Sequence, residues 1–179
     1  MTPLRGWKLS SLIVPAVAAL VLLADQATKV LVRANLTPGQ SLALAPWLTP
    51  LLQITYVTNT GAAFGLFPGW SQILIAIALI VIVALVWYTF QLPDGQWLMH
   101  VALGLQLGGA SGNLIDRLRF GGSVLDFIDL NFWPLRRWPV FNVADSSIVV
   151  GVTLLTLLML WAEWREERAS RELATAEDD

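Results

Sequence analysis

Two aspartates in the second half of the chain, Asp126 and Asp145, have surroundings that suit acid–base chemistry. Asp126 lies in the apolar, strand-like run Val-Leu-Asp-Phe-Ile-Asp, and Asp145 lies at the start of an apolar segment. A carboxyl group in apolar surroundings is costly unless it is paired or protonated. If the two side chains converge, repulsion in a low dielectric prevents both from ionising, so one keeps a proton while the other can activate water. Aspartic proteases use such a pair.

The segment around Asp145 also has a purely structural interpretation. Asn142 precedes Asp145 by three residues, which resembles a capping box at the start of a helix. A carboxylate in the first helical turn is also stabilised as an anion by the helix dipole. Capping and catalysis therefore both stay open for this segment. Asp129, three residues after Asp126, is expected to face water.

Asp25 and Lys29 form a second polar pair, four residues apart and hence on one helix face. Ionisable groups inside an apolar segment are costly, so this pair is either a simple ion pair or a group that positions substrate. Asn59 begins the run Asn-Thr-Gly-Ala-Ala-Phe over residues 59–64. On its own, this run indicates only a turn after a strand.

Asn113 and Arg117 share a helix face in the glycine-rich segment 109–117, with Asp116 beside them. A cation suits a helix C-terminus, which explains Arg117 but not Asn113. The same segment contains Gly-x-Ser-Gly around Ser111, as rhomboid-type intramembrane serine proteases do. His100, the one histidine, lies about 16 Å away along the same expected helix. A serine–histidine pair is therefore excluded.

The composition indicates a membrane protein and excludes several other classes. Of the 179 residues, 56% are hydrophobic and 13% are charged, against about 25% charged residues in soluble domains. The length fits one domain. There is no cysteine, which excludes a disulfide framework, a thiol nucleophile and a cysteine-based metal site. We expect neither a metal nor a cofactor. The net charge is −2 and the basic residues are scattered, so nothing indicates nucleic-acid binding.

Four apolar segments are candidates to cross a bilayer, which takes about 20 residues. They run over residues 12–32, 73–90, 97–115 and 143–161. A basic start followed by an apolar run also describes a cleavable signal peptide, but the first run continues past Asp25 and Lys29 without a clear cleavage site. We predict an all-α integral membrane domain. Its connections 34–71 and 116–142 lie on one side, and a charged tail over residues 163–179 lies on the other.

Both long connections contain a strand-like run, over residues 51–58 and 123–130. These runs predict a small β-element at the membrane surface. Four tryptophans of the connections would lie at that interface as an aromatic belt: Trp47, Trp70, Trp133 and Trp138. Basic residues are divided nearly evenly between the two sides, so their distribution does not decide the orientation.

Five polar motifs together resemble those of the lipoprotein signal peptidase family, also called type II signal peptidase. They are Asp25-Gln26-x-x-Lys29, Asn59-Thr60-Gly61-Ala62-Ala63-Phe64, Gly112-Asn113-Leu114-Ile115-Asp116-Arg117, Val124-Leu125-Asp126-Phe127 and Phe141-Asn142-x-Ala144-Asp145-Ser146. Each motif alone is weak, but the five occur in the family's order and cover most of the chain. Three departures lie outside the motifs: Ser111, a short second loop without basic residues, and the acidic tail.

The resemblance implies a bacterial membrane aspartyl endopeptidase of four helices, with Asp126 and Asp145 as the catalytic dyad. It further implies polar residues that shape the site and bind substrate: Asp25, Lys29, Asn59, Asn113, Arg117 and Asn142. The family's substrate is a prolipoprotein whose signal peptide is cut before a diacylglyceryl-modified cysteine. The implied site is on the periplasmic side of the cell membrane, with both termini cytoplasmic and membrane lipids around the helices. We take a monomer as the default assembly.

Two other functions remain as alternatives. A small proton-coupled transporter would carry carboxylates at helix midpoints and weak inverted repeats between its halves, and we find neither pattern. A non-catalytic membrane scaffold would account for capped helices and ion pairs, but it leaves the five ordered motifs unexplained.

Overall fold

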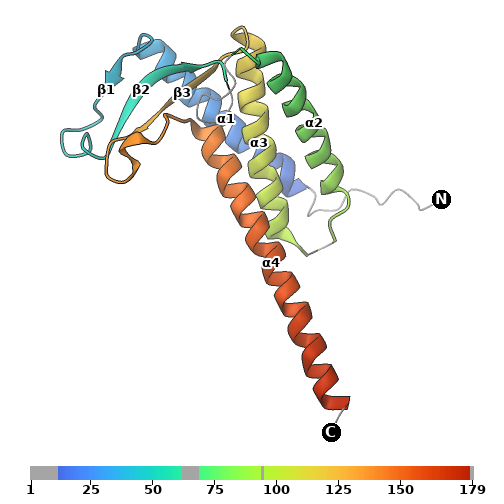
Figure 1. Ribbon diagram of the computed structural model, residues 1–179. Helices are drawn as coiled ribbons and strands as arrows, with labels where there is room; N and C mark the ends of the chain where they lie inside the picture. The colour runs from blue at the N-terminus through green and yellow to red at the C-terminus, as the bar shows by residue number, and fades with distance from the viewer. Residues whose placement is uncertain (1–11, 62–68, 94, 178–179) are drawn as a thin grey trace.

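The computed structural model describes residues 12–61, 69–93 and 95–177, which form long helices with a small sheet at one end (Figure 1). The elements in chain order are α1 (Ile13–Asn35), β1 (Ser41–Leu42), β2 (Leu52–Asn59), α2 (Ser71–Thr89), α3 (Trp97–Arg119), β3 (Val124–Leu130), the 3-10 turn η3 (Leu135–Arg137) and α4 (Val143–Glu177). Within the described residues, three helices are long and apolar enough to cross a membrane: α1, α2 and the Val143–Arg171 part of α4.

Helix α3 differs from the other three in composition and in surroundings. It contains four glycines as well as polar residues such as Gln106 and Asn113, which make it less apolar than α1, α2 and the membrane-length part of α4. It packs against α1, α2 and α4 and is central among them (Figure 1). Polar groups within membrane helices normally face the interior of the bundle, so a central helix can carry them. That α3 also crosses the membrane stays a prediction.

Glycines let α3 approach its neighbours closely. A Cβ atom at Gly108 would lie 2.7 Å from the carbonyl oxygen of Ala18 in α1, and one at Gly109 would collide with the carbonyl oxygen of Ala144 in α4. Close backbone approach is a main source of helix association in lipid, where the hydrophobic effect does not drive it. The glycines therefore let α3 pack closely against both α1 and α4.

The Gly109→Val variant should unfold at a lower temperature than the wild type. Its side chain would meet Ala144 and Ser147 of α4, and overpacking of this kind costs about 1–3 kcal/mol. Thermal unfolding of the purified protein in detergent measures the loss. Ala84→Val places the same side chain on an exposed position of α2 and should leave the unfolding temperature unchanged. Equal stability of the two variants would show that Gly109 is not a close contact.

Helix α3 ends at Arg119, four residues beyond the segment 97–115 expected from hydropathy. Asp116 and Arg117 therefore lie on the helix and not in the following connection. Gly121 and Gly122, with φ of 60° and 90°, follow its end in a conformation that glycine adopts without strain. The N–H of Gly122 donates to the carbonyl oxygen of Arg117 at 2.8 Å, as at other glycine-terminated helices.

Helix α4 continues past the apolar segment 143–161 as far as Glu177. Most of the charged tail is therefore helical, and Figure 1 shows it projecting beyond the ends of α2 and α3. The last two residues, 178–179, lie outside the described part of the chain.

The sheet has the order β1-β2-β3 and is antiparallel. The pairing of β2 with β3 places Val57 opposite Asp126 and Asn59 opposite Val124, with an irregularity between Ile54 and Val57. The expected β-element from both long connections is confirmed, and the two-residue strand β1 is an addition. A small apolar core joins the sheet to the end of α1: Val32, Leu36, Leu125 and Phe127.

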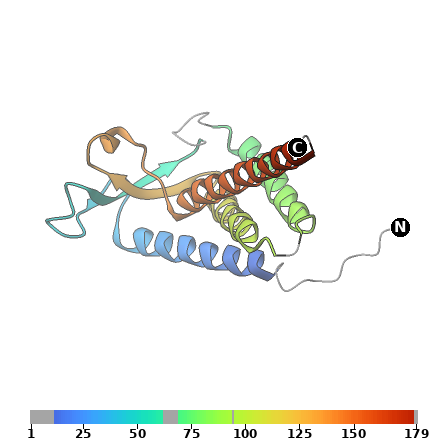
Figure 2. The same ribbon diagram turned by 90° about the horizontal axis from the view of Figure 1, so that it is seen from below.

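Figure 2 shows the sheet beside the C-terminal end of α1 and the first turns of α4. The four tryptophans expected at an interface, Trp47, Trp70, Trp133 and Trp138, are all exposed. Their contact with a membrane surface stays a prediction.

Candidate active site

Asp126 and Asp145 lie on different elements but share a partner. Asp126 is on β3, and Asp145 is in the first turn of α4. Asn142 lies between them: its side-chain Nδ2 donates to Asp126 Oδ1 at 2.7 Å, and its backbone N–H donates to Asp145 Oδ2 at 3.2 Å. Asp126 is 3% exposed and Asp145 is half-buried. The fold therefore brings both carboxyl groups to one residue.

Two further asparagines donate to the remaining carboxyl oxygens. Asn59 Nδ2 donates to Asp126 Oδ2 at 3.1 Å, and Asn113 Nδ2 donates to Asp145 Oδ1 at 2.7 Å. Together with the two bonds from Asn142, each oxygen of the pair accepts a hydrogen bond. A side-chain amide donates without titrating, so these donors hold both carboxyl groups whichever one carries a proton.

The capping interpretation of this segment is compatible with the chemical one. Asn142 Oδ1 accepts the backbone N–H of Asp145 at 2.8 Å, while Asp145 Oδ2 accepts the N–H of Asn142. This reciprocal pair has the hydrogen bonds of a capping box. The cap uses one oxygen of Asp145, and the other faces Asn113.

A buried lysine sets the orientation of Asn113. Lys29 Nζ donates to Asn113 Oδ1 at 3.2 Å, and Asn142 Nδ2 donates to the same oxygen at 3.1 Å. An ammonium group can only donate, so the oxygen of this amide must face Lys29. The Nδ2 group of Asn113 is then turned toward Asp145.

Lys29 belongs to a cluster of four charges behind the asparagines. Its Nζ lies 2.9 Å from Asp25 Oδ2 and 3.2 Å from Asp116 Oδ2. Arg33 Nη2 lies 3.1 Å from the same oxygen of Asp116. Asp25, Lys29 and Asp116 are fully buried. Two cations balance two anions, which is the condition under which buried charges are tolerated.

The two carboxylates of the cluster also hold the backbone next to each aspartate of the pair. Asp25 Oδ1 accepts the N–H of Ala144 at 3.0 Å, and Asp116 Oδ2 accepts the N–H of Leu125 at 3.0 Å. Ala144 and Leu125 are the residues immediately before the two aspartates. The cluster therefore positions β3 and the start of α4 relative to α1 and α3.

Arg117 lies at the edge of this arrangement, where burial lowers its pKa and the nearby charges of Asp145 and Asp126 offset part of that effect. Its Nη2 donates to the carbonyl oxygen of Gly61 at 3.0 Å. The N–H of Gly61 in turn donates to Asn59 Oδ1 at 2.9 Å, which is an Asx turn. Arg117 Nε is buried without a hydrogen-bond partner among the described residues. The remainder of the 59–64 motif, Ala62 to Phe64, lies outside them.

The pKa of Asp126 is raised from the ordinary 3.8 to about 7. Burial is the largest cause, and repulsion from Asp145 acts in the same direction. Hydrogen bonds from Asn59 and Asn142 and the charge of Lys29 lower the pKa and offset part of the rise. Asp126 therefore keeps its proton at pH values where an ordinary aspartate is ionised.

Two members of the cluster, Arg33 and Asp116, and the neighbouring Gln26 were absent from the predicted substrate-binding set. Gln26 Nε2 donates to Asp25 Oδ2 at 3.1 Å and to Asp116 Oδ1 at 3.3 Å. Arg33 follows Lys29 by four residues, so helical spacing could have identified it. Asp25 and Lys29, expected to bind substrate, have no exposed surface, which favours a positioning role.

Other polar residues singled out in the sequence lie elsewhere. Asp129 Oδ2 accepts hydrogen bonds from Gln53 Nε2 and Thr55 Oγ1, each at 2.7 Å. His100 is buried near the start of α3, with Nδ1 2.8 Å from the carbonyl oxygen of Gln96. No group of three or more His, Asp or Glu side chains in the described part of the chain is arranged to hold a metal ion.

Fold and site together define a helical membrane protein with two carboxyl groups converging where the helices meet a small sheet. The profile of the signal peptidase (SPase) II family matches residues 17–161. The chain belongs to this family of peptidases, as its motifs predicted.

Relatives and a solved structure agree with this assignment. The lipoprotein signal peptidase of Desulfitobacterium hafniense is 46% identical over 144 residues, which cover 80% of this chain and 90% of the relative. That of Syntrophomonas wolfei is 47% identical over 149 residues, covering 83% and 93%. A solved bacterial membrane enzyme superposes with a TM-score of 0.73 at 36% identity, covering 84% of this chain and 87% of that one.

Proposed function

We propose that this protein is an aspartic endopeptidase that removes the signal peptide from diacylglyceryl-modified prolipoproteins, cutting before the lipidated cysteine. The observation that carries the proposal is the convergence of Asp126 and Asp145 on Asn142, at the end of an apolar set of helices. The similarity to proteins named lipoprotein signal peptidases supports the substrate class. A proton-coupled transporter would need carboxylates at helix midpoints, whereas these lie on β3 and in the first turn of α4.

In the proposed mechanism, Asp145 is the base and Asp126 carries the proton. The helix dipole favours an anion in the first turn of α4, and the pKa of Asp126 is about 7. Asp145 takes a proton from water, and the hydroxide attacks the scissile carbonyl carbon. Asp126 gives its proton to the carbonyl oxygen, which forms a tetrahedral diol. The diol collapses when Asp145 protonates the leaving amine and a diol hydroxyl returns a proton to Asp126.

Arg117 and the turn at Asn59 are the proposed contacts for substrate backbone. A guanidinium group carries five N–H donors, and those of Arg117 that reach protein acceptors go to the carbonyl oxygens of Gly61 and Asn113. A donor that holds a substrate carbonyl in register contributes through positioning. No group in this mechanism comes from a cofactor or a second chain, so a monomer is sufficient.

We also propose that all four helices cross the bacterial cell membrane, with the site periplasmic and both termini cytoplasmic. The site and the sheet lie together at one end of the helices, and the charged part of α4 lies at the other (Figure 1). Asn113 and Asp116 of α3 face α4 and α1, as polar side chains of a central membrane helix should.

Purified full-length protein in detergent should cleave a lipid-modified prolipoprotein before its modified cysteine. The same prolipoprotein without the lipid is the control and should remain intact. Mass spectrometry of the products identifies the cut. A chelator should leave the rate unchanged. Failure of folded wild-type protein to cut the lipidated substrate would refute the proposed function.

The rate of cleavage should fall above about pH 7, because Asp126 then loses the proton that the mechanism requires. A single ionisation lowers kcat/KM about tenfold per pH unit beyond its pKa. In Asn59→Ala, the ionised form of Asp126 loses a hydrogen bond, so its pKa rises and the alkaline limb moves to higher pH. Asn35→Ala, whose exposed side chain bonds the carbonyl oxygen of Leu31, should leave the limb in place. If the alkaline limb of Asn59→Ala stays where it is in the wild type, Asp126 is not the group whose ionisation lowers the rate at high pH.

A further inference from the structure

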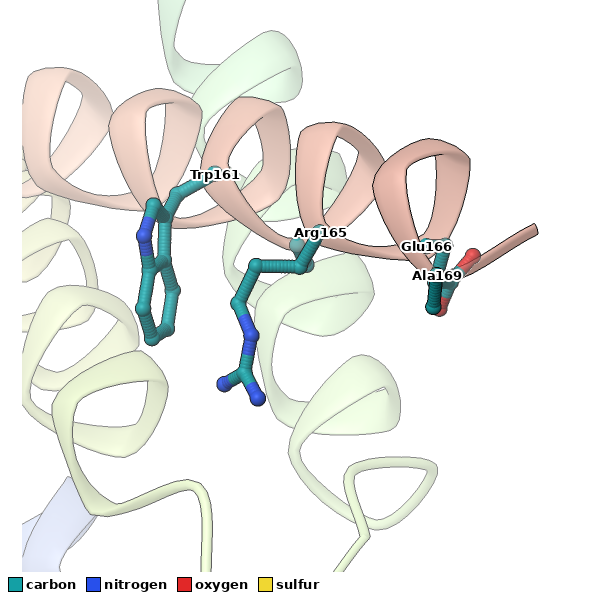
Figure 3. Close-up of a pocket in the computed structure, with 5 residues that line it drawn as sticks. Trp161, Arg165, Glu166 and Ala169 are labelled. Atoms are coloured by element: carbon teal, nitrogen blue, oxygen red, sulfur yellow. The ribbon is translucent and has the colours of Figure 1, made fainter. Parts of the chain in front are cut away.

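The charged end of α4 carries two stacked pairs of arginine and tryptophan. The guanidinium carbon of Arg165 lies 4.9 Å from the centre of the Trp161 ring, and that of Arg168 lies 4.7 Å from the centre of the Trp164 ring. Figure 3 shows Trp161 and Arg165 projecting side by side from the same side of the helix. The rings are about half exposed. These cations are therefore presented on aromatic surfaces at the side of the helix.

The charges of this stretch are separated by sign around the helix. Positions 161, 164, 165 and 168 share one face by helical spacing, whereas 163, 166, 167 and 170 share another. The first face carries the two Trp–Arg pairs, and the second carries Glu163, Glu166 and Glu167. An open hollow of about 320 Å³ lies on the flank between the two faces, lined by Trp161, Ala162, Arg165, Glu166 and Ala169. One side of α4 is thus cationic and aromatic.

The same face is apolar one turn earlier. Leu157 precedes Trp161 by four residues and Trp164 by seven, and its side chain is exposed. Along about 16 Å of helix, the face changes from an aliphatic side chain to indole rings and then to guanidinium groups. Tryptophan favours the level of lipid headgroups, and Arg165 lies about 6 Å beyond Trp161. The headgroup layer of one leaflet is about 5–7 Å thick.

We propose that this face, made of Leu157, Trp161, Trp164, Arg165 and Arg168, binds an anionic phospholipid in the leaflet opposite the active site. The acyl chains would lie along Leu157, and the phosphate would accept hydrogen bonds from the two arginines, whose planar donors match phosphate geometry. An acidic protein would satisfy the arginines alone, whereas the aliphatic and aromatic part of the face requires an amphiphile. The site holds the end of α4 at a defined depth.

The chain contains no cysteine, so Leu160→Cys can carry one fluorophore on an exposed position beside this face. The labelled full-length protein is reconstituted in phosphatidylcholine vesicles with a small fraction of brominated phosphatidylglycerol or brominated phosphatidylcholine. A brominated lipid quenches the fluorophore only when it lies next to the label at the helix surface. We expect stronger quenching by phosphatidylglycerol at low salt, and loss of the difference at high salt.

The Arg165→Gln/Arg168→Gln variant should lose this preference, by about fivefold for each arginine removed. Arg119→Gln/Arg136→Gln removes the same charge at the sheet end of the molecule and should keep it. Both variants should retain cleavage activity, because neither pair contacts the candidate site. Equal quenching by the two lipids in wild type, or an equal preference in both variants, would overturn the proposal. If the true occupant of this face is an acidic protein, the two lipids should quench the wild-type label equally.

Discussion

Asp126→Asn and Asp145→Asn should each lower kcat for cleavage of lipid-modified prolipoprotein by at least about 10³-fold. Asparagine has nearly the shape of aspartate, but its amide neither takes a proton from water nor gives one to a carbonyl oxygen. The oxygen of the new amide can still accept a hydrogen bond, so Asp145→Asn keeps an acceptor for the helix cap. Single-turnover cleavage in detergent measures the loss, and thermal unfolding reports whether each variant is folded.

Asp129→Asn is a matched control for this experiment. It lies on the same strand as Asp126, and its carboxylate is bound by Gln53 and Thr55, away from Asn59, Asn113 and Asn142. Its rate should stay close to that of the wild type. A folded Asp126 or Asp145 variant that still turns over at the wild-type rate would disprove the dyad assignment.

Lys29→Met should be the most destabilising single substitution among the polar residues. Without the ammonium group, the carboxylates of Asp25 and Asp116 stay buried and lose their shared cation. Removal of one partner from a buried ion pair costs about 3–5 kcal/mol. Cleavage should fall as well, because Asn113 Oδ1 then loses one of its two donors and only Asn142 still orients the amide toward Asp145. Thermal unfolding and cleavage rate are measured on the same preparation.

Two comparisons separate this effect from a simple change of charge. Arg171→Met removes a cation from an exposed helical pair with Glu167 and should leave stability almost unchanged. Asp25→Asn combined with Lys29→Met should be more stable than Lys29→Met alone, because one uncompensated charge is gone and an oxygen still accepts the N–H of Ala144. If the double variant is the less stable one, the cluster is not held by charge balance.

The motifs named residues that lie together in the structure, but spacing did not give their hydrogen-bond partners. Asn59, Asn113 and Asn142 were expected to shape the site and bind substrate, and their amides donate to Asp126 and Asp145. Their contact with substrate stays a prediction. Hydrogen-bond direction follows from three-dimensional neighbours, which spacing along the chain does not contain. Arg117, with a buried Nε that has no partner among the described residues, is the member of that set that we propose as a substrate contact.

The end of α3 illustrates a second limit. Hydropathy ends this helix before Asp116 because charged residues are unfavourable in lipid. The structure continues it to Arg119, since Asp116 is paired with Lys29 and Arg33 from α1. A cost computed for an isolated charge does not apply once a distant segment supplies its partner.

By itself, the sequence determined the apolar segments, the two strands of the surface element and the polar motifs at the helix ends. Each of these follows from local composition and periodicity, which need no knowledge of distant residues. Only the tertiary structure decided which carboxyl groups converge on Asn142 and which accept hydrogen bonds from the backbone behind them. That distinction depends on burial and on the direction of each N–H group, and both arise when α1, α3, α4 and the sheet pack together.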